Sequence, residues 1–327
     1  MKEHEIRKKE TFDRYLQLVA QDVDKYFAED SAFVKVDCPA CKSPDYDAQF
    51  KKNRFTYVLC RKCATLFVNP RPPFDDLIQF YANSESTAYF VNDFFKPVAE
   101  VRREKIFRPR AEYIAQRFAK SPIQTIGDIG AGFGLFLDEI KKLMPEKRFV
   151  AIEPSEEMVE ICKTKGLEVL PCVMEDVVGY DEQFDLLCSF ELFEHLYDPE
   201  LFLKKVHQLL KKGGHFLFTT LSGTGFDIQL LWEKSKSVSP PHHLNFFNPK
   251  SAALILERCG FKVVEAATPG QLDWDIVEGA MTRDGMELGR FWKNLSGLMS
   301  AEAKEELQRW ISKNLLSSHM RILAVKI

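Results

Sequence analysis

Hydrophobic residues recur at two different spacings along this chain of 327 residues. Between residues 12 and 27 they lie three or four positions apart with charged residues between them, which predicts an amphipathic helix. From residue 124 onward, short apolar runs typical of strands alternate with stretches of helical spacing. Such alternation predicts an α/β fold with a doubly wound parallel sheet. The expected strands are 125–129, 148–152, 168–170, 184–189, 215–221, 262–268 and 320–327.

The same pattern divides the chain into four segments. Residues 1–36 hold the N-terminal amphipathic helix, which we expect to pack as a strap on the main body. Residues 37–73 contain short β-like runs between proline turn signals and are too poor in apolar residues to fold unaided. We interpret residues 74–120 as a helical linker and residues 121–327 as the α/β domain, with a helical insertion at 270–318 that can cap the sheet.

Charge and composition exclude several classes of protein. The 45 Lys and Arg residues are balanced by 48 Asp and Glu residues, a net charge of −3, so no basic excess indicates binding to a phosphate backbone. A hydrophobic content of 45% rules out disorder over most of the chain. Residues 1–30 lack an apolar stretch of the length that a signal peptide or membrane span needs. We therefore expect a cytoplasmic protein without a membrane span.

Four of the eight cysteines form two pairs with the spacing of metal ligands. Cys38-Pro-Ala-Cys41 is followed, after 18 intervening residues, by Cys60-Arg-Lys-Cys63. Two thiolate pairs, each on a tight turn, can close a tetrahedral zinc site of the zinc-ribbon type. Four sulfur ligands leave no open coordination position, so the predicted zinc is structural. The other cysteines occur singly and are expected to be small buried hydrophobic residues: Cys162, Cys172, Cys188 and Cys259.

A glycine-rich loop directly follows the first expected strand of the α/β domain. Asp128 precedes Gly130, Gly132 and Gly134, and a helix is expected to begin after them. Glycines let the backbone turn sharply and approach a ligand, while the free N–H groups of the next helix favour a carboxylate or phosphate. Glu153 lies 19 residues beyond Gly134, at the end of the next strand, where it can accept hydrogen bonds from ribose hydroxyls. The loop therefore predicts a nucleotide-type cofactor, with Asp128 placed to hold an ammonium group.

Further motifs follow in chain order. They are Phe184-Asp185, Glu194-His195-Leu-x-Asp198-Pro199 and Leu210-Lys-Lys-Gly213-Gly214. Together with the glycine loop and Glu153, they resemble class I S-adenosylmethionine-dependent methyltransferases over residues 120–268 and the last strand. The cysteine module, which continues into Phe67-Val-Asn-Pro-Arg-Pro, resembles the zinc ribbon that precedes this domain in a subgroup linked to sugar and polysaccharide modification. The resemblance implies a Rossmann-like, seven-stranded methyltransferase sheet, preceded by a small zinc-ribbon module and a helical linker.

The resemblance also implies cofactor contacts at the ends of the expected strands. The glycine loop and the acid before it would hold the amino acid end of S-adenosylmethionine, and Glu153 its ribose. Glu175 or Asp176, just after the third strand, would contact adenine. The implied cofactor residues are Asp128, Gly130, Gly132, Gly134, Glu153, Glu175, Asp176 and, lining the cleft, Glu191.

Glu191-Leu-Phe-Glu194-His195 permits two interpretations. It matches the Glu-x-x-Glu-His stretch of ubiquinone-pathway O-methyltransferases, where this stretch is linked to a magnesium ion. Neighbouring carboxylates suit a hard divalent cation, although a histidine ligand is less usual for magnesium. In the alternative interpretation, these residues line the cofactor cleft and cap the following helix.

Pro240-Pro241-His242-His243-Leu-Asn-Phe-Phe is the second stretch with catalytic residue types. A histidine, with an ordinary pKa of ~6.5, suits proton removal near neutral pH. A similar stretch in sugar C-methyltransferases has Glu-His here, with a tyrosine two residues before the Glu; His242 and Pro240 replace that Glu and Tyr. We predict that His243 is the base, with His242 as its positioning partner or substitute, and that Glu194 and His195 line the opposite side of the cleft. A histidine merely hydrogen-bonded in a loop is the alternative.

The expected protein is an enzyme that transfers the methyl group of S-adenosylmethionine to a small-molecule or sugar/polysaccharide-type acceptor. An RNA methyltransferase that uses the zinc ribbon to bind nucleic acid is one alternative. The negative net charge weakens it, and Ser189-Phe-Glu-Leu does not resemble the Asn/Asp-Pro-Pro-aromatic motif of enzymes that methylate base amino groups. A non-catalytic zinc-ribbon binding protein is the other alternative, but nothing in the glycine loop looks degraded.

Overall fold

A computed structural model describes residues 1–29 and 32–327 of the chain. Residues 30 and 31, which belong to the predicted N-terminal segment, lie outside the described residues. The described chain forms two compact units, each built from separate stretches of sequence. The first unit comprises Met1–Val98, Leu221–Ala252 and Ala267–Met320; the second comprises Ala99–Thr220, Ala253–Ala266 and Arg321–Ile327.

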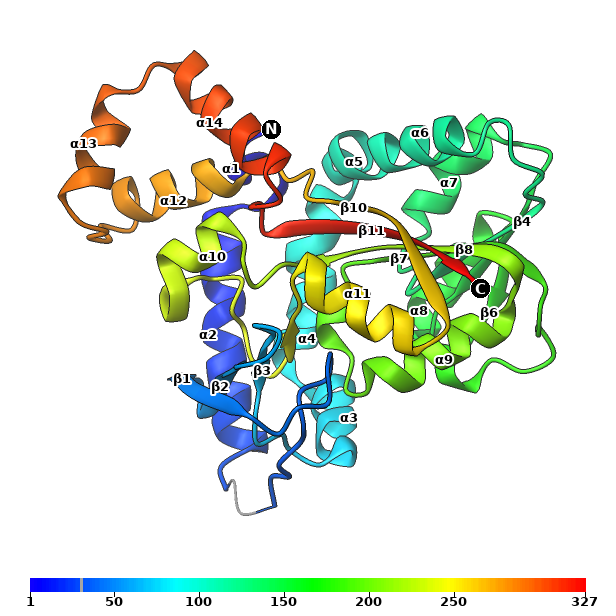
Figure 1. Ribbon diagram of the computed structural model, residues 1–327, viewed down its shortest axis with the longest axis horizontal. Helices are drawn as coiled ribbons and strands as arrows, with labels where there is room; N and C mark the ends of the chain where they lie inside the picture. Colours follow the sequence, from blue (N-terminus) through cyan, green and yellow to red (C-terminus); the bar gives the residue numbers. More distant parts are fainter. Residues whose placement is uncertain (30–31) are drawn as a thin grey trace. The chain divides into compact units, whose positions relative to one another are not determined.

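A seven-stranded sheet forms the second unit and confirms the predicted methyltransferase-type α/β fold. Its strand order is β10-β11-β8-β7-β4-β5-β6 (Figure 1). The bounds are β4 (Thr125–Ile129), β5 (Arg148–Ile152), β6 (Glu168–Leu170), β7 (Phe184–Phe190), β8 (Leu210–Leu221), β10 (Phe261–Ala267) and β11 (His319–Lys326). The first three match the predicted ranges, whereas β8 begins five residues before the predicted 215–221.

Helices cover both faces of this sheet, so its central strands are buried on both faces. The strand β4 pairs in parallel with β5 and β7, and all five of its residues are buried. On one face, Ile114 of α6 and Ile140 of α7 share a core with Ile126 of β4. On the other face, α9 lies against the sheet (Figure 1). Its Phe202 ring packs against Phe216 of β8. The helices are α5 (Ala99–Arg102), η3 (Arg103–Phe107), α6 (Arg108–Arg117), α7 (Leu135–Leu143), α8 (Glu156–Thr164), η4 (Met174–Asp176), η5 (Phe193–His195), α9 (Pro199–Leu209) and α11 (Pro249–Arg258).

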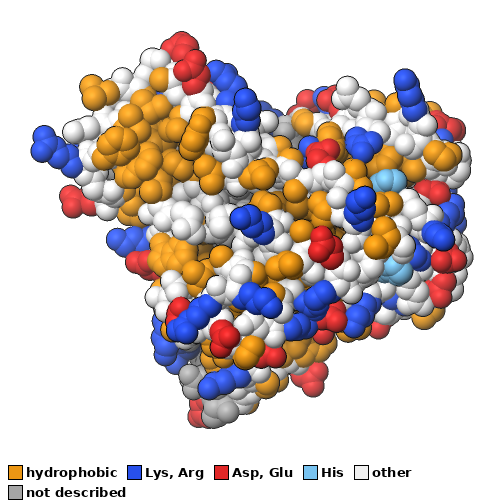
Figure 2. All heavy atoms as spheres, in the orientation of Figure 1, with side chains coloured by type: hydrophobic (Ala, Val, Ile, Leu, Met, Phe, Trp, Pro, Cys, Tyr) orange, Lys and Arg blue, Asp and Glu red, His pale blue; other side chains and the backbone are white. Residues whose placement is uncertain are grey.

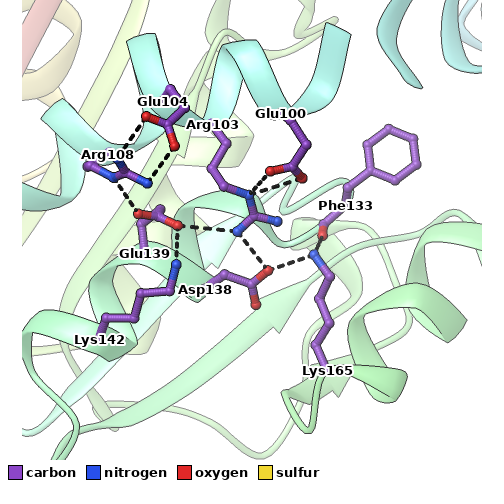
Figure 3. A network of polar contacts seen from close by, with 9 residues as sticks. All are labelled: Glu100, Arg103, Glu104, Arg108, Phe133, Asp138, Glu139, Lys142 and Lys165. Carbon is purple, nitrogen blue, oxygen red and sulfur yellow. Dashed lines mark hydrogen bonds and ion pairs between the residues drawn. The ribbon is translucent and has the colours of Figure 1, made fainter. Parts of the chain in front are cut away.

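An ion-pair network joins the predicted linker to the sheet domain (Figure 3). The buried carboxylate of Glu139, on α7, bonds both Arg103 and Arg108 at 3.3 and 3.0 Å. Although burial alone raises the pKa of this carboxyl, hydrogen bonds from Lys142, Arg108 and Arg103 lower it to about 2. The network holds η3 and α6 against α7. The predicted linker covered residues 74–120, and its part from Ala99 onward belongs to the second unit.

The first unit contains a four-stranded antiparallel sheet in the order β1-β2-β3-β9. Its strands are β1 (Tyr46–Lys52), β2 (Phe55–Cys60), β3 (Leu66–Val68) and β9 (Asn245–Phe246). The last strand comes from the stretch 240–247, which we expected to be only a connection. Leu66 pairs with Phe246 and Phe67 with Asn245. A two-residue strand has no alternating pattern for sequence analysis to detect.

Helix α2 confirms the predicted N-terminal helix, although it spans Lys9–Tyr26 rather than 12–27. Its apolar face is buried against rings of the next helical segment; for example, the Phe12 and Phe94 rings lie 5.4 Å apart. The other helices of this unit are α1 (Glu3–Ile6), α3 (Phe74–Asn83), α4 (Glu85–Tyr89), η1 (Phe90–Phe95), η2 (Lys96–Val98), α10 (Phe226–Leu231), η6 (Trp232–Lys234), α12 (Asp273–Thr282), α13 (Arg290–Leu298) and α14 (Ala301–Lys313).

The predicted helical insertion at 270–318 consists of α12, α13 and α14, and it is only partly packed. Trp274 and Val277 of α12 form a small core with Leu231. Helix α13 buries none of its side chains, and Phe291 and Leu298 are 67% and 84% exposed. Hydrophobic side chains consequently gather on the surface of this region (Figure 2). Among the helices of residues 1–29 and 32–327, none combines the length and apolar character that a membrane crossing requires.

Candidate cofactor site and metal centre

The three glycines of the loop after β4 all have positive φ, but they serve two purposes. The φ values of Gly130, Gly132 and Gly134 are +71°, +54° and +67°. A Cβ at Gly134 would lie 2.9 Å from Leu167, so this glycine is also required by packing. A Cβ at Gly130 or Gly132 would have no neighbour nearer than 3.4 Å or 3.9 Å. These two positions therefore form an open cradle in which a ligand can approach the backbone.

Asp128, at the carboxyl side of β4, has a buried carboxylate with an unsatisfied oxygen. The residue is 2% exposed, and its Oδ1 atom has no hydrogen-bond partner among the described residues. Burial raises the pKa of this carboxyl well above its ordinary value, and the nearby Arg110 opposes that shift. A buried acceptor without a donor is costly unless a ligand supplies one. An ammonium group fits this requirement.

Glu153, at the end of β5, ties the glycine loop to the neighbouring strand. Its Oε2 atom accepts a hydrogen bond from Gly132 N at 2.8 Å, and its Oε1 atom accepts one from Ser155 N at 2.9 Å. Burial raises the pKa of this carboxyl, while the two backbone hydrogen bonds lower it. Each carboxylate oxygen has a further lone pair, so the side chain can accept two hydroxyl donors.

The loop is also supported by Lys165, which sequence analysis did not single out. Its ammonium donates to the carbonyl oxygen of Phe133 at 2.6 Å and to Asp138 at 2.8 Å (Figure 3). Phe133 lies between Gly132 and Gly134, so this contact fixes the carbonyl in the middle of the cradle. The same Asp138 bonds Arg103 at 3.2 Å, which connects the loop to the ion-pair network of α6 and α7.

The two acids predicted to contact adenine lie together on η4. Glu175 is partly buried, and burial raises the pKa of its carboxyl. Asp176 is exposed. Glu175 is therefore the better placed of the two to meet a partly enclosed ligand, and its contact with adenine stays a prediction.

Glu191 follows β7 with a φ of +54°, an uncommon conformation for a residue with a side chain. Its Oε1 atom accepts hydrogen bonds from Arg110 Nη2 and from Thr219 Oγ1, each at 2.7 Å. Arg110 belongs to the predicted linker, and no motif singled it out; its role depends on this tertiary contact. The Arg110 guanidinium thus already places a positive charge beside the Glu191 carboxylate. This carboxylate is one of the groups predicted to bind magnesium.

Glu194 and His195 both lie on η5. Glu194 is 2% exposed and accepts a hydrogen bond from Thr220 Oγ1 at 2.8 Å. Burial, followed by repulsion from Glu191, raises the pKa of Glu194. A bound cation would lower this pKa again, so the magnesium ion stays a prediction.

His242 and His243 belong to the first unit and have different surroundings. His242 is 6% exposed, and its ring contacts those of Tyr15, Phe80 and Tyr81 at centroid distances of 5.8, 5.1 and 5.4 Å. Burial, together with its neighbour His243, lowers the pKa of His242 to about 3. His243 is only partly buried, and its Nδ1 atom lies 2.5 Å from the carbonyl oxygen of Ser237. A carbonyl only accepts, so Nδ1 carries the proton and Nε2 keeps a lone pair.

The four predicted metal ligands converge in the first unit. The Sγ atoms of Cys38, Cys41, Cys60 and Cys63 all lie within 4.8 Å of one another. The Cys38–Cys63 and Cys41–Cys60 pairs are each separated by 3.5 Å. Tetrahedral Zn–S bonds of ~2.3 Å place sulfurs about 3.8 Å apart, so this cluster fits a zinc ion.

Matching backbone turns present the two cysteine pairs. The carbonyl of Cys38 accepts from Lys42 N at 2.9 Å, and that of Cys60 accepts from Ala64 N at 3.0 Å. Lys42 and Ala64 both have positive φ, 58° and 55°. Asn248 donates its side-chain amide to the carbonyls of Cys63 and Ala64 at 2.9 and 3.1 Å. A residue near β9 therefore fixes the second turn.

Known proteins place this architecture in a family. A protein family described as "Methyltransferase domain" matches residues 98–266, just over half of the chain. The chain belongs to this methyltransferase family, and S-adenosylmethionine is its cofactor. One solved structure with a similar fold is the plantazolicin methyltransferase BpumL in complex with a monoazolic desmethylPZN analog and S-adenosylhomocysteine. The two chains are 14% identical, and the match covers 76% of this chain and 93% of BpumL. The TM-score of 0.50 indicates a shared fold.

Two curated relatives are ubiquinone biosynthesis O-methyltransferases. The Dictyostelium discoideum mitochondrial protein is 24% identical over 173 residues, covering 46% of this chain and 54% of that protein. The Mesorhizobium japonicum protein is 29% identical over 146 residues, covering 41% and 57%. A Methanocaldococcus jannaschii protein without an assigned function is 24% identical over 164 residues, covering 50% and 77%. The chain thus spans little more than half the length of the two named enzymes.

Proposed function

We propose that this protein transfers the methyl group of S-adenosylmethionine to a hydroxyl oxygen of a small-molecule acceptor. The observation that carries the proposal is the open cradle between Asp128 and Glu153. Gly130 and Gly132 adopt positive φ without a packing neighbour that demands glycine, and a buried carboxylate oxygen lies unsatisfied beside them. The unsatisfied oxygen is costly in a protein without a ligand at this loop, and the two glycines leave room for a ligand to approach the backbone.

Each residue of the cradle has a proposed task. S-adenosylmethionine supplies an electrophilic methyl group on its sulfonium. Asp128 accepts hydrogen bonds from the amino acid ammonium, and Glu153 accepts them from the ribose hydroxyls. Glu175 bonds the adenine edge, and Glu191, held by Arg110, lines the cleft. Because the methyl group is already reactive, these contacts contribute mainly by positioning it and excluding water.

His243 is the proposed general base. Its Nδ1–H is held by the Ser237 carbonyl, which orients the ring, and Nε2 is the atom proposed to take the proton of the acceptor hydroxyl. His242 is unsuited to act as the substitute base, because burial and His243 hold its pKa near 3. We assign His242 a positioning role within the aromatic cluster of Tyr15, Phe80 and Tyr81. Glu194 and His195 are proposed to line the acceptor side of the cleft.

The identity of the acceptor forms a narrower proposal. The two ubiquinone biosynthesis enzymes are named O-methyltransferases, which favours oxygen as the methylated atom. The resemblance of the cysteine module to the zinc ribbon of sugar-modifying methyltransferases favours a carbohydrate-type hydroxyl. The proposed zinc ion, held by Cys38, Cys41, Cys60 and Cys63, has a structural task and does not touch the acceptor. Its thiolate ligands suit the reducing cytoplasm that we propose as the location.

The test measures transfer of tritiated methyl groups from S-adenosylmethionine into fractionated cell extracts, followed by purification of the labelled acceptor. His243→Ala is expected to lower turnover on that acceptor by ~10²–10⁴-fold, while the affinity for S-adenosylhomocysteine changes by less than about threefold. His207→Gln, a change on α9 at a histidine with no proposed task, is the matched control. Full turnover of His243→Ala would refute the role of base. Absence of S-adenosylhomocysteine binding by the unchanged protein would refute the proposed function itself.

A further inference from the structure

A pocket of about 90 Å³ lies within the first unit, outside the predicted cofactor residues. It is formed by α1, the beginning of α2, the segment that follows α10, and the end of α12 with the loop after it. Its apolar lining comes from Phe12, Leu231, Ile276, Ala280 and Met286. Sites for whole small molecules measure ~300–1,000 Å³, so this pocket admits a small apolar group rather than a whole cofactor.

The charged side chains around this pocket are predominantly cationic. The cations are Arg7, Lys9, Lys234, Lys236 and Arg283. The lining carboxylates are Glu3 and Asp284. Asp13, which bonds Lys9 at 2.7 Å and Lys236 at 2.8 Å, adds a third negative charge directly behind them. Five cations against three carboxylates leave an excess of two positive charges around an apolar lining.

Most of these cations are held in place, and one is not. Lys9 and Lys236 both contact Asp284, at 3.0 and 3.1 Å, and Arg283 contacts Glu3 at 3.0 Å. Lys234 is exposed and forms no ion pair with any residue among 1–29 and 32–327. Fixed cations supply a steady positive potential, and an unpaired lysine can close on a ligand at little cost in broken contacts.

We infer that this pocket binds a small organic anion, with the apolar part of the ligand inside and its carboxylate or phosphate among the cations at the rim. An uncharged apolar molecule would leave the excess positive charge uncompensated. An inorganic anion would leave the apolar lining in water. A ligand with both parts satisfies both surfaces, which is the usual composition of a small-molecule site.

The pocket wall leads directly to the two histidines. Ser237 lines the pocket, and its carbonyl oxygen is the atom that holds His243 Nδ1 at 2.5 Å. On the other wall, Phe12 stacks on Tyr15 with centroids 6.0 Å apart, and Tyr15 contacts the His242 ring at 5.8 Å. Occupancy of the pocket therefore changes the surroundings of the His242–His243 pair through one residue on each side. This inference concerns binding and does not rest on the proposed methyl transfer.

Calorimetry on the full chain tests the site with five probes. Benzoate carries both a ring and a negative charge, and we expect it to bind. Benzyl alcohol lacks the charge, inorganic phosphate lacks the ring, and benzylamine reverses the charge; all three are expected to bind more weakly than benzoate. Benzyl phosphate separates a phosphate-type from a carboxylate-type ligand. Equal binding of benzoate and benzylamine, or of benzoate and inorganic phosphate, would overturn the inference.

Lys234 gives the matched variants, because it is exposed and its replacement breaks no ion pair. Lys234→Gln is expected to weaken benzoate about two- to fivefold, and Lys234→Glu by roughly the square of that factor. Lys141→Gln, an exposed lysine of α7 in the second unit, is expected to leave the affinity unchanged. Nitrogen-15 chemical shifts of the His243 ring, assigned by their loss in His243→Gln, should move when benzoate binds. Unchanged affinity in Lys234→Glu refutes the site, and unmoved His243 shifts on saturation refute its connection to the histidines.

Discussion

The two sheets of this protein are stabilised in different ways. In the seven-stranded sheet, β4 is buried along its whole length between helices on both faces. In the four-stranded sheet, β1 has no buried residue, and the sheet relies on a cysteine cluster and on the two-residue strand β9 from far along the chain. Strands β2, β3 and β9 also bury apolar side chains, such as Phe55, Phe67 and Phe246, but only the four-stranded sheet adds a cysteine cluster beside its strands among the described residues. We therefore expect the two units to respond differently to the same perturbation.

Metal removal should give the largest effect, confined to the first unit. Cys60→Ser removes one of four sulfur ligands, and structural zinc sites contribute about 10–16 kcal/mol of apparent binding free energy at neutral pH. We expect the variant to lose its zinc and the packing of β1, β2 and β3, while the seven-stranded sheet stays folded. Elemental analysis gives zinc per chain, and hydrogen exchange reports each sheet separately.

Cys188→Ser is the matched control for the cysteine change. Cys188 is fully buried in β7 of the second unit and is not part of the cluster. It should keep one zinc per chain and lose stability only in the seven-stranded sheet, by about 1–3 kcal/mol. A Cys60→Ser protein that keeps its zinc, or that unfolds both sheets together, would contradict the contrast between the units.

The same contrast explains what the sequence could predict. Strands β4, β5 and β6 were predicted to the residue, because each is a short run that lies between glycine or proline turn signals in the sequence. The cysteine cluster was predicted from its spacing alone. By contrast, β9 was missed because its two residues have no pattern of their own; they are a strand only because β3 lies beside them.

Within the candidate site, sequence analysis identified residue types but not their partners. The glycine loop was recognised, yet only the structure separates Gly134, which packs against Leu167, from the open positions Gly130 and Gly132. Arg110 was missed because its importance lies in a contact with Glu191, 81 residues later in the chain. The low pKa of His242 follows from burial among aromatic rings that two distant helices supply. Such properties depend on tertiary packing and have no local signal.

A buried acid gives the first unit a pH dependence that can be measured against the second. Asp227 is fully buried on α10; burial, and then the neighbouring Asp273, raise its pKa from 3.8 to about 7. The folded chain thus binds a proton that the unfolded chain has already released above pH 4. The contribution of this group to stability falls as the pH rises from about 4 to about 7, and it is constant above that.

Asp227→Asn should therefore flatten the pH profile of the first unit. Relative to the unchanged protein, we expect the variant to gain about 4 kcal/mol in free energy of unfolding between pH 4 and pH 8. Urea denaturation at both pH values measures the difference, and contributions of other buried acids, such as Glu194 in the second unit, cancel in the comparison. Asp93→Asn, at an exposed acid, is the control and should show no gain. Equal pH slopes for Asp227→Asn and the unchanged protein would contradict a raised pKa at Asp227.

The smallest expected effect concerns the cofactor and is confined to the second unit. Glu153→Ala removes the acceptor of the Gly132 and Ser155 N–H groups and, in our proposal, of the ribose hydroxyls. We expect S-adenosylhomocysteine binding to weaken by about 1.5–3 kcal/mol, the range for a charge-assisted hydrogen bond, with zinc content unchanged at one per chain. Calorimetry provides the measurement, and Glu156→Ala, at an exposed acid on α8, is the control. If NAD bound more tightly than S-adenosylhomocysteine in the same experiment, the cradle would belong to a different cofactor. If Glu153→Ala bound S-adenosylhomocysteine as well as Glu156→Ala does, Glu153 would serve only to hold the glycine loop against β5.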